Sequence, residues 1–223
     1  TYDKMSEQKI AKEKEPMFSA KVLKLLRNPL NLENPVTVQV LGICSALAVT
    51  VQMKPAIVMA LSVTVVTAFS NLIISSLRNT IPSRIRIIVQ LVVVAALVII
   101  VDQILKAYVY DVSKKLSVFV GLIITNCILM GRLEAYAMAN KPWPSFVDGF
   151  GNGLGYGLIL VMVAFFRELL GSGKFYGMPV IPKAFYEFGY VDNGLMILPP
   201  MALITIGVII WVQRSRTKEL QEK

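Results

Sequence analysis

The chain has 223 residues, of which 55% are hydrophobic, and its mean hydropathy is +0.63. A soluble domain of this length does not carry so many long uncharged runs, so the composition indicates an integral membrane protein. The formal charge of +9 does not indicate nucleic-acid binding, because the basic residues fall in tails and loops beside apolar segments, where they set orientation and contact lipid headgroups.

Residues 1–35 are predicted to form a cytoplasmic basic tail. They contain seven Lys and Arg residues and no compact apolar stretch ending in small residues, so no cleavable signal peptide is expected. A second cytoplasmic tail is predicted at 213–223. Between the tails, loops that carry charge, Pro or Gly separate six apolar segments. The segments are 36–51, 56–77, 85–109, 116–130, 149–166 and 195–212.

The lengths of these segments differ in a regular way. The second and third are long enough to cross a bilayer core, which needs roughly 20 residues, and the fifth and sixth just suffice. The first and fourth are too short for an uninterrupted crossing. An even number of crossings places both termini on one side, and 16 of the 23 Lys and Arg residues fall on that side. The positive-inside rule therefore predicts that both termini are cytoplasmic.

The six segments divide into two sets of three, 36–109 and 116–212, and the short segment comes first in each set. Because three is an odd number, a structural duplication of one set onto the other would be inverted in the membrane, as in many transporters. We therefore predict an all-α membrane protein with six transmembrane segments. They would form two inverted three-helix repeats, each beginning with a short or broken helix.

Each short segment contains one of the two cysteines of the chain, Cys44 and Cys127. At 1.5 Å per helical residue they lie about 12 and 16 Å into their segments, near the centre of a hydrocarbon core of about 30 Å. Interrupted helices at matched positions indicate a site at the bilayer midplane. Small or hydrogen-bonding neighbours, such as Ser45 and Asn126, allow close backbone approach. We expect the two thiols to meet there.

The residues alone leave three interpretations of the cysteine pair open. A membrane cysteine usually packs as a small hydrophobe, and a disulfide is a second alternative. The third is a metal site. Because the chain has no His and only two thiols, an iron–sulfur cluster that needs four thiolates would require a partner chain to supply the rest.

Charged and glycine-rich positions give further candidates. Asp102 lies at membrane depth, where an ionisable residue is a candidate for a sodium pathway, but an i, i+4 ion pair with Lys106 is the structural alternative. We interpret Arg167 and Glu168, which end the fifth segment, as an interfacial ion pair. The run GNGLGYG at 151–157 lacks the Lys and Ser/Thr of a phosphate loop, and its glycines predict a helix-contact surface.

Four runs of this sequence resemble one family of membrane proteins, the NqrD/RnfE family. The runs are LGICSALAVT at 41–50, DQILKAYVYD at 102–111, LSVFVGLIITNCILMGR at 116–132 and GNGLGYG at 151–157. The likeness covers about residues 34–212. The family includes NqrD of the bacterial Na+-translocating NADH:quinone reductase and RnfE of the Rnf-type ferredoxin:NAD+ oxidoreductase. The Rnf pattern usually has Pro after the first cysteine, where this chain has Ser45, and this difference favours the quinone reductase.

The resemblance implies that Cys44 and Cys127 are ligands of a [2Fe-2S] cluster shared with NqrE, a homologous protein of opposite membrane orientation. The cluster would relay electrons from the cytoplasmic NqrF to FMN on NqrC. NqrA and NqrB would complete the complex, which couples quinone reduction by NADH to Na+ export. This chain would be a non-autonomous member of that complex in the bacterial inner membrane, with no flavin and no catalytic residue of its own.

Two hypotheses of other classes remain. In an inverted-repeat solute or ion transporter, the broken helices would bind the transported species and the cysteines would only pack. In a passive assembly scaffold, both cysteines would tolerate replacement by Ser.

Overall fold

The computed structural model describes residues 25–29, 33–82, 84–108, 121–175, 178–179 and 194–216. The described residues are almost entirely helical, which confirms the predicted class. Most of the tail at 1–35, the loop at 109–115, the beginning of the fourth segment at 116–120 and the end of the C-terminal tail at 217–223 lie outside the described residues.

Among the described residues, three helices are long and apolar enough to cross a membrane, and they confirm the second, third and fifth predicted segments. They are α4 (Met53–Leu77), α5 (Arg86–Tyr108) and α8 (Pro142–Ser172). Helix α8 begins earlier than predicted, at Pro142. Proline is tolerated in the first turn, because the N–H groups of that turn form no hydrogen bond within the helix. It ends at Gly173, whose φ of 61° is left-handed.

The sixth segment forms two elements. The 3₁₀ helix η2 (Gly194–Ile197) comes first, and α10 (Pro199–Arg216) follows with two prolines at its start. Helix α10 has 18 residues, about 27 Å at 1.5 Å per residue, and Arg214 and Arg216 fall in its last turn. Two strands of two residues each, β1 (Lys174–Phe175) and β2 (Met178–Pro179), pair antiparallel just after α8.

The described parts of the first and fourth segments contain only short helices, as predicted. The first contains α3 (Ile43–Val49), with seven residues. The fourth has helical residues at 121–124, then a break, then α7 (Cys127–Arg132), with six residues. A π-helical turn, η1 (Leu133–Ala137), continues α7.

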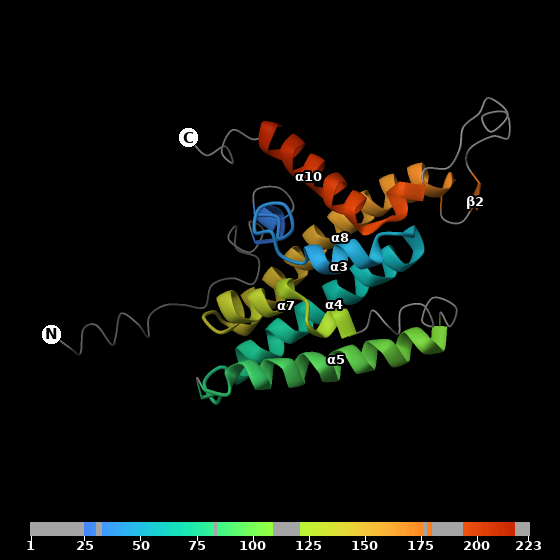
Figure 1. Ribbon diagram of the computed structural model, residues 1–223. Helices are drawn as coiled ribbons and strands as arrows, with labels where there is room; N and C mark the ends of the chain where they lie inside the picture. The colour runs from blue at the N-terminus through green and yellow to red at the C-terminus, as the bar shows by residue number, and fades with distance from the viewer. Residues whose placement is uncertain are drawn as a thin grey trace, which may run out of the picture.

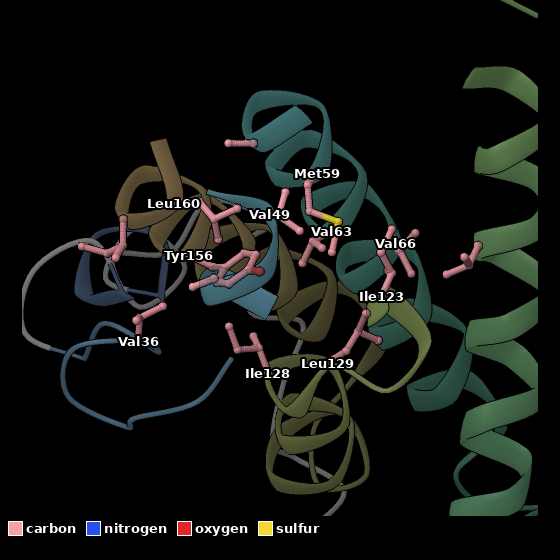
Figure 2. Close-up of a cluster of buried hydrophobic side chains, with 14 of the residues drawn as sticks. Val36, Val49, Met59, Val63, Val66, Ile123, Ile128, Leu129, Tyr156 and Leu160 are labelled. Atoms are coloured by element: carbon pink, nitrogen blue, oxygen red, sulfur yellow. The ribbon is translucent and has the colours of Figure 1, made fainter. Parts of the chain in front are cut away.

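Helices α4 and α8 lie side by side at the centre of the molecule (Figure 1). Helix α5 packs on α4 along one edge, and α10 crosses α8 on the other side. Between them, α3 and α7 lie against the central pair, and buried hydrophobic side chains from these elements form a continuous core (Figure 2). The labelled members are Val36, Val49, Met59, Val63, Val66, Ile123, Ile128, Leu129, Tyr156 and Leu160.

Glycines allow α8 to approach its neighbours closely. A Cβ on Gly153 would lie 2.6 Å from Thr64 Cα, and one on Gly157 would lie 3.0 Å from Ala60 Cβ, so this face of α8 contacts the backbone of α4. A Cβ on Gly155 would lie 2.5 Å from the Pro29 carbonyl oxygen, so another face contacts the N-terminal helical turn at 25–29. The predicted helix-contact surface is confirmed, and the seam at Gly153 and Gly157 sets the closeness of the central helix pair.

Candidate functional site at the two cysteine-bearing turns

Cys44 lies in the first turn of α3, directly after a strained bend. Val40 has a φ of 58° and Gly42 a φ of 76°, both left-handed, so no helix can form through them. Upstream of this bend, the Asn34 side chain accepts hydrogen bonds from the Val36 and Thr37 N–H groups at 3.0 and 3.2 Å. The first part of this segment therefore forms turns, and its helix begins only at Ile43.

Cys127 is the first residue of α7, after a break of the same kind. Asn126 is extended, and its side-chain oxygen accepts a hydrogen bond from the Ile128 N–H at 3.2 Å. This is an N-cap, in which a side chain replaces a missing helical acceptor. Both cysteines thus occupy the start of a short helix that follows a non-helical turn.

Hydrogen bonds fasten these two turns together. Ser45 follows Cys44, and Asn126 precedes Cys127. Asn126 Nδ2 donates a hydrogen bond to Ser45 Oγ at 3.4 Å. Ser45 Oγ also lies 2.8 Å from the Tyr156 hydroxyl and 2.9 Å from the Gly42 carbonyl oxygen. Ser45, Asn126 and Tyr156 are all buried. The two turns therefore share one buried polar cluster, which lies between α3, α7 and α8.

Apolar contact supports the same arrangement. A Cβ on Gly42 would lie 2.6 Å from Ile128 Cδ1 and 3.2 Å from the Tyr156 ring, so a side chain on Gly42 would push the turns apart. Figure 2 shows Tyr156 among Val49, Leu160 and Ile128, with its hydroxyl directed into this junction. The two cysteine-bearing segments therefore meet through their flanking residues, and the expectation that the two thiols themselves meet stays a prediction.

Both thiols are free and exposed on this chain. Exposure argues against a packing role within the chain, and the free thiols give no support to the disulfide alternative. No group of three or more His, Cys, Asp or Glu side chains with metal-binding geometry occurs among the described residues. The donor set offered here is two exposed thiols, which suits half of the four-thiolate ligand set of a [2Fe-2S] cluster.

An ion pair anchors the helix that carries Cys127. Arg132, the last residue of α7, forms a two-point ion pair with the buried Asp148 carboxylate of α8, and the Nε to Oδ2 distance is 2.9 Å. Asn152 Nδ2 donates to the same carboxylate at 3.1 Å. Nearby, burial raises the pKa of the Tyr136 phenol, and the Asp148 charge adds to the rise while Arg132 opposes it. The ion pair was not predicted from the sequence, because Arg132 and Asp148 both lie outside the predicted apolar segments.

A second ionic contact ties η1 to α5. Glu134 forms an ion pair with Arg86 and accepts a hydrogen bond from Gln90 Nε2 at 3.2 Å. Together with the Arg132 pair, it attaches the region that follows Cys127 to two long helices.

The charged candidates in the long helices have structural partners. Lys106 Nζ lies 2.6 Å from Asp102 Oδ2, which confirms the i, i+4 pair. Arg167 and Glu168 are buried among the helices of this chain, and their position at the membrane interface stays a prediction. Glu168 Oε2 accepts from the Met53 N–H at 2.6 Å.

Arg167 donates to the ends of two other elements. It reaches the Thr50 hydroxyl at 2.6 Å, just after α3, and the Ile197 carbonyl oxygen at 2.7 Å, at the end of η2. Further bonds reach the carbonyl oxygens of Leu47, Met196 and Leu198. Helix C-termini leave carbonyl groups without partners, and the five donors of a guanidinium can satisfy several at once.

An apolar cavity of about 570 Å³ lies away from the cysteines, between α8 and α10. No titratable side chain of the described residues lines it. Its walls are Asn34, Leu158, Ile159, Met162, Phe166, Leu170, Met196, Met201, Ile204, Thr205, Val208, Ile209, Val212 and Gln213. The cavity therefore offers no acid, base or nucleophile.

Comparison with known proteins places the whole membrane region in one family. Residues 22–210 match the profile of the family described as "Rnf-Nqr subunit, membrane protein". The chain belongs to the Rnf-Nqr family. This agrees with the resemblance of its sequence motifs, and the apolar helices agree with a membrane protein family.

Among Rnf-Nqr members, the similar curated relatives are named as the D subunit of Na(+)-translocating NADH-quinone reductase. The relative from Aeromonas hydrophila is 59% identical over 201 residues, which cover 90% of this chain and 96% of the relative. That from Photobacterium profundum is 61% identical over 86% of this chain and 91% of its own length. That from Haemophilus ducreyi is 58% identical over 93% and 100%. These relatives are thus named as parts of an oxidoreductase complex.

Proposed function

We propose that this chain is NqrD, the D subunit of a Na+-translocating NADH:quinone reductase, and that Cys44 and Cys127 supply two thiolates to a [2Fe-2S] cluster shared with the homologous NqrE. The observation that carries the proposal is the junction of the two cysteine-bearing turns, which brings two exposed thiols onto neighbouring segments. The names of the relatives support the complex, and the two thiols support the type of cofactor.

The residues present fit such a cluster in number and chemistry. Two thiolates from this chain and two from a partner complete the four that a [2Fe-2S] cluster needs, and exposure leaves the thiols accessible to that partner. When bound, the cluster supplies one-electron transfer through the membrane. The chain holds the thiolates at the starts of α3 and α7, and its buried core behind them excludes water.

The architecture proposed for the membrane is six crossings in two inverted repeats, with both termini in the cytoplasm. The order of elements supports it, since α3, α4 and α5 run short, long, long, and α7, α8 and α10 follow the same order. The packing supports it too, because the two second helices, α4 and α8, contact each other while α5 and α10 lie outside them (Figure 1). The charge distribution supports the orientation in the bacterial inner membrane.

In this proposal the chain acts only within its complex. Cys44 and Cys127 would hold half of the cluster, which would relay electrons from NqrF on the cytoplasmic side to FMN on NqrC, and NqrA and NqrB would complete the NADH:quinone reductase. The chain carries no flavin. Coupling of electron transfer to Na+ export belongs to the assembled complex.

Iron analysis of the purified complex tests the proposal. Cys44→Ala or Cys127→Ala should remove the iron and acid-labile sulfide of one [2Fe-2S] cluster per complex and abolish its electron paramagnetic resonance signal. Quinone reduction should stop, while NADH oxidation by an artificial acceptor should survive. Ser76→Ala is the matched control, because it is a small polar residue exposed near the end of α4, and it should change nothing.

Unchanged iron and quinone reduction in both cysteine variants would refute the cluster. Full function of the Cys→Ser variants would indicate an assembly scaffold. Substrate flux in liposomes by this chain alone, with no electron donor, would indicate a solute transporter. Reduction of NAD+ by ferredoxin in the assembled complex would indicate the Rnf-type oxidoreductase, in which this chain would be RnfE.

A further inference from the structure

The junction of the cysteine-bearing turns centres on a single oxygen atom, Ser45 Oγ. A hydroxyl group has one proton to donate. Ser45 is placed to donate it to the Gly42 carbonyl oxygen at 2.9 Å, three residues back. The 2.8 Å contact with Tyr156 is then a hydrogen bond donated by the tyrosine, and the 3.4 Å contact is donated by Asn126 Nδ2.

This direction of donation gives Tyr156 a particular task. Ser45 follows Cys44 and Asn126 precedes Cys127, so each turn contributes one residue to the cluster, and Tyr156 comes from α8, outside both turns. The Tyr156 residue is fully buried, which leaves its hydroxyl no water as an alternative partner. Its position on α8 is determined by close packing, since Gly155 and Gly157 beside it contact neighbouring backbone and side chains directly.

We propose that the Tyr156 hydroxyl is a positioning group that fixes the spacing of the two cysteine-bearing turns, and through it the fit of the Cys44 and Cys127 thiolates to the shared cluster. The second half of this statement rests on the proposed function. The first half concerns this chain alone. The effect of Tyr156 on the two turns passes through its hydrogen bond to Ser45, which in turn accepts from Asn126.

Tyr156→Phe is the main test, because it removes the hydroxyl and keeps the ring that packs against Gly42. In purified complex freed of iron by a chelator, a short bismaleimide should cross-link Cys44 to Cys127 about fivefold more slowly than in the wild type, as read by peptide mass spectrometry. In untreated complex, iron release to the chelator should be about five- to tenfold faster, which corresponds to the loss of one hydrogen bond worth about 1 kcal/mol.

Ser45→Ala should give the same two changes, since it removes the acceptor of the same hydrogen bond. The double variant should be no worse than the more affected single variant, because residues that act through one bond are not additive. Tyr136→Phe is the matched control. It makes the same chemical change in η1, away from the junction, and should behave as wild type.

Cross-linking and iron release within twofold of wild type in both single variants would overturn the inference. So would effects that multiply in the double variant. The results distinguish failure of this inference from failure of the proposed function. If only the proposed function is wrong, Cys44→Ala leaves the iron content unchanged while Tyr156→Phe still slows cross-linking. If Tyr156→Phe does not assemble, Ser45→Ala carries the test, with the melting temperature of the complex as the check on folding.

Discussion

The seam between α4 and α8 makes a quantitative prediction for Gly153→Ala. The new Cβ would lie 2.6 Å from Thr64 Cα and 3.0 Å from Thr64 Cβ, whereas non-bonded carbons normally approach to about 3.5 Å. Because the obstacle includes backbone, no side-chain rotation relieves the clash, and the helices must separate locally by about 1 Å. Overpacking of this kind costs about 1–3 kcal/mol, and the better helix propensity of Ala returns up to about 1 kcal/mol.

The midpoints of these two ranges give a net loss of about 1.5 kcal/mol, which lowers the melting temperature by about 3–6 °C for a chain of this size. Two glycines of the same chain provide graded controls. Gly157→Ala places its Cβ 3.0 Å from the Ala60 methyl group, a clash of a few tenths of an ångström, and should be nearly neutral. Gly207→Ala meets nothing within 4 Å on α10 and should be neutral or stabilising.

Thermal unfolding of the purified complex, with detection of this chain, measures the series. The predicted order of stability is Gly207→Ala, then Gly157→Ala, then Gly153→Ala. Equal melting temperatures for the Gly153 and Gly207 variants would refute the close contact of α4 with α8.

Three further predictions concern the anchors of the site. Gly42→Ala should cost about 2 kcal/mol, because a left-handed φ disfavours Ala and the Cβ would collide with Ile128, and the iron content of the complex should fall. Arg167→Lys should lower the melting temperature by an amount equivalent to about 2 kcal/mol, since an ammonium group cannot reach all the oxygen acceptors of the guanidinium, whereas Arg216→Lys at the exposed end of α10 should not. Arg132→Gln should cost about 3 kcal/mol by leaving the buried Asp148 carboxylate without its cation, and Asp148→Asn in the same chain should recover part of the loss; no recovery would contradict the pairing.

The long helices were predictable because lipid leaves the backbone few choices. A spanning segment must satisfy its own N–H and C=O groups, so a long uncharged run becomes a helix. The beginning of α8 was missed because hydropathy treats Asp148 as a charge that ends the segment. In the structure that charge is neutralised by Arg132, which belongs to another helix.

The short helices were predictable as short, and their residues show why. Gly42 and Asn126 are local signals, a left-handed bend and an N-cap, and both act within a few residues of the cysteine they precede. Tyr156 was not predictable as a partner of these turns. It stood in a glycine-rich run that indicated packing, and its hydrogen bond joins residues 111 positions apart.

The partners of Arg167 were not predictable for a related reason. A charged residue at the end of an apolar run is normally expected at the water interface. In the structure α8 continues to Ser172 and the guanidinium is buried against the ends of α3 and η2, where its acceptors are the Thr50 hydroxyl and carbonyl groups that no sequence pattern marks.

The glycine contacts on two faces of α8 also restrict how this protein can move. Thr64 of α4 packs against Gly153, and Pro29 packs against Gly155. If α4 slid along α8 by one residue, about 1.5 Å, Thr64 would no longer lie opposite Gly153. Interlocked surfaces resist such shear. The helix pair is therefore a stiff frame, and under the proposed function such a frame would keep tunnelling distances to the shared cluster constant.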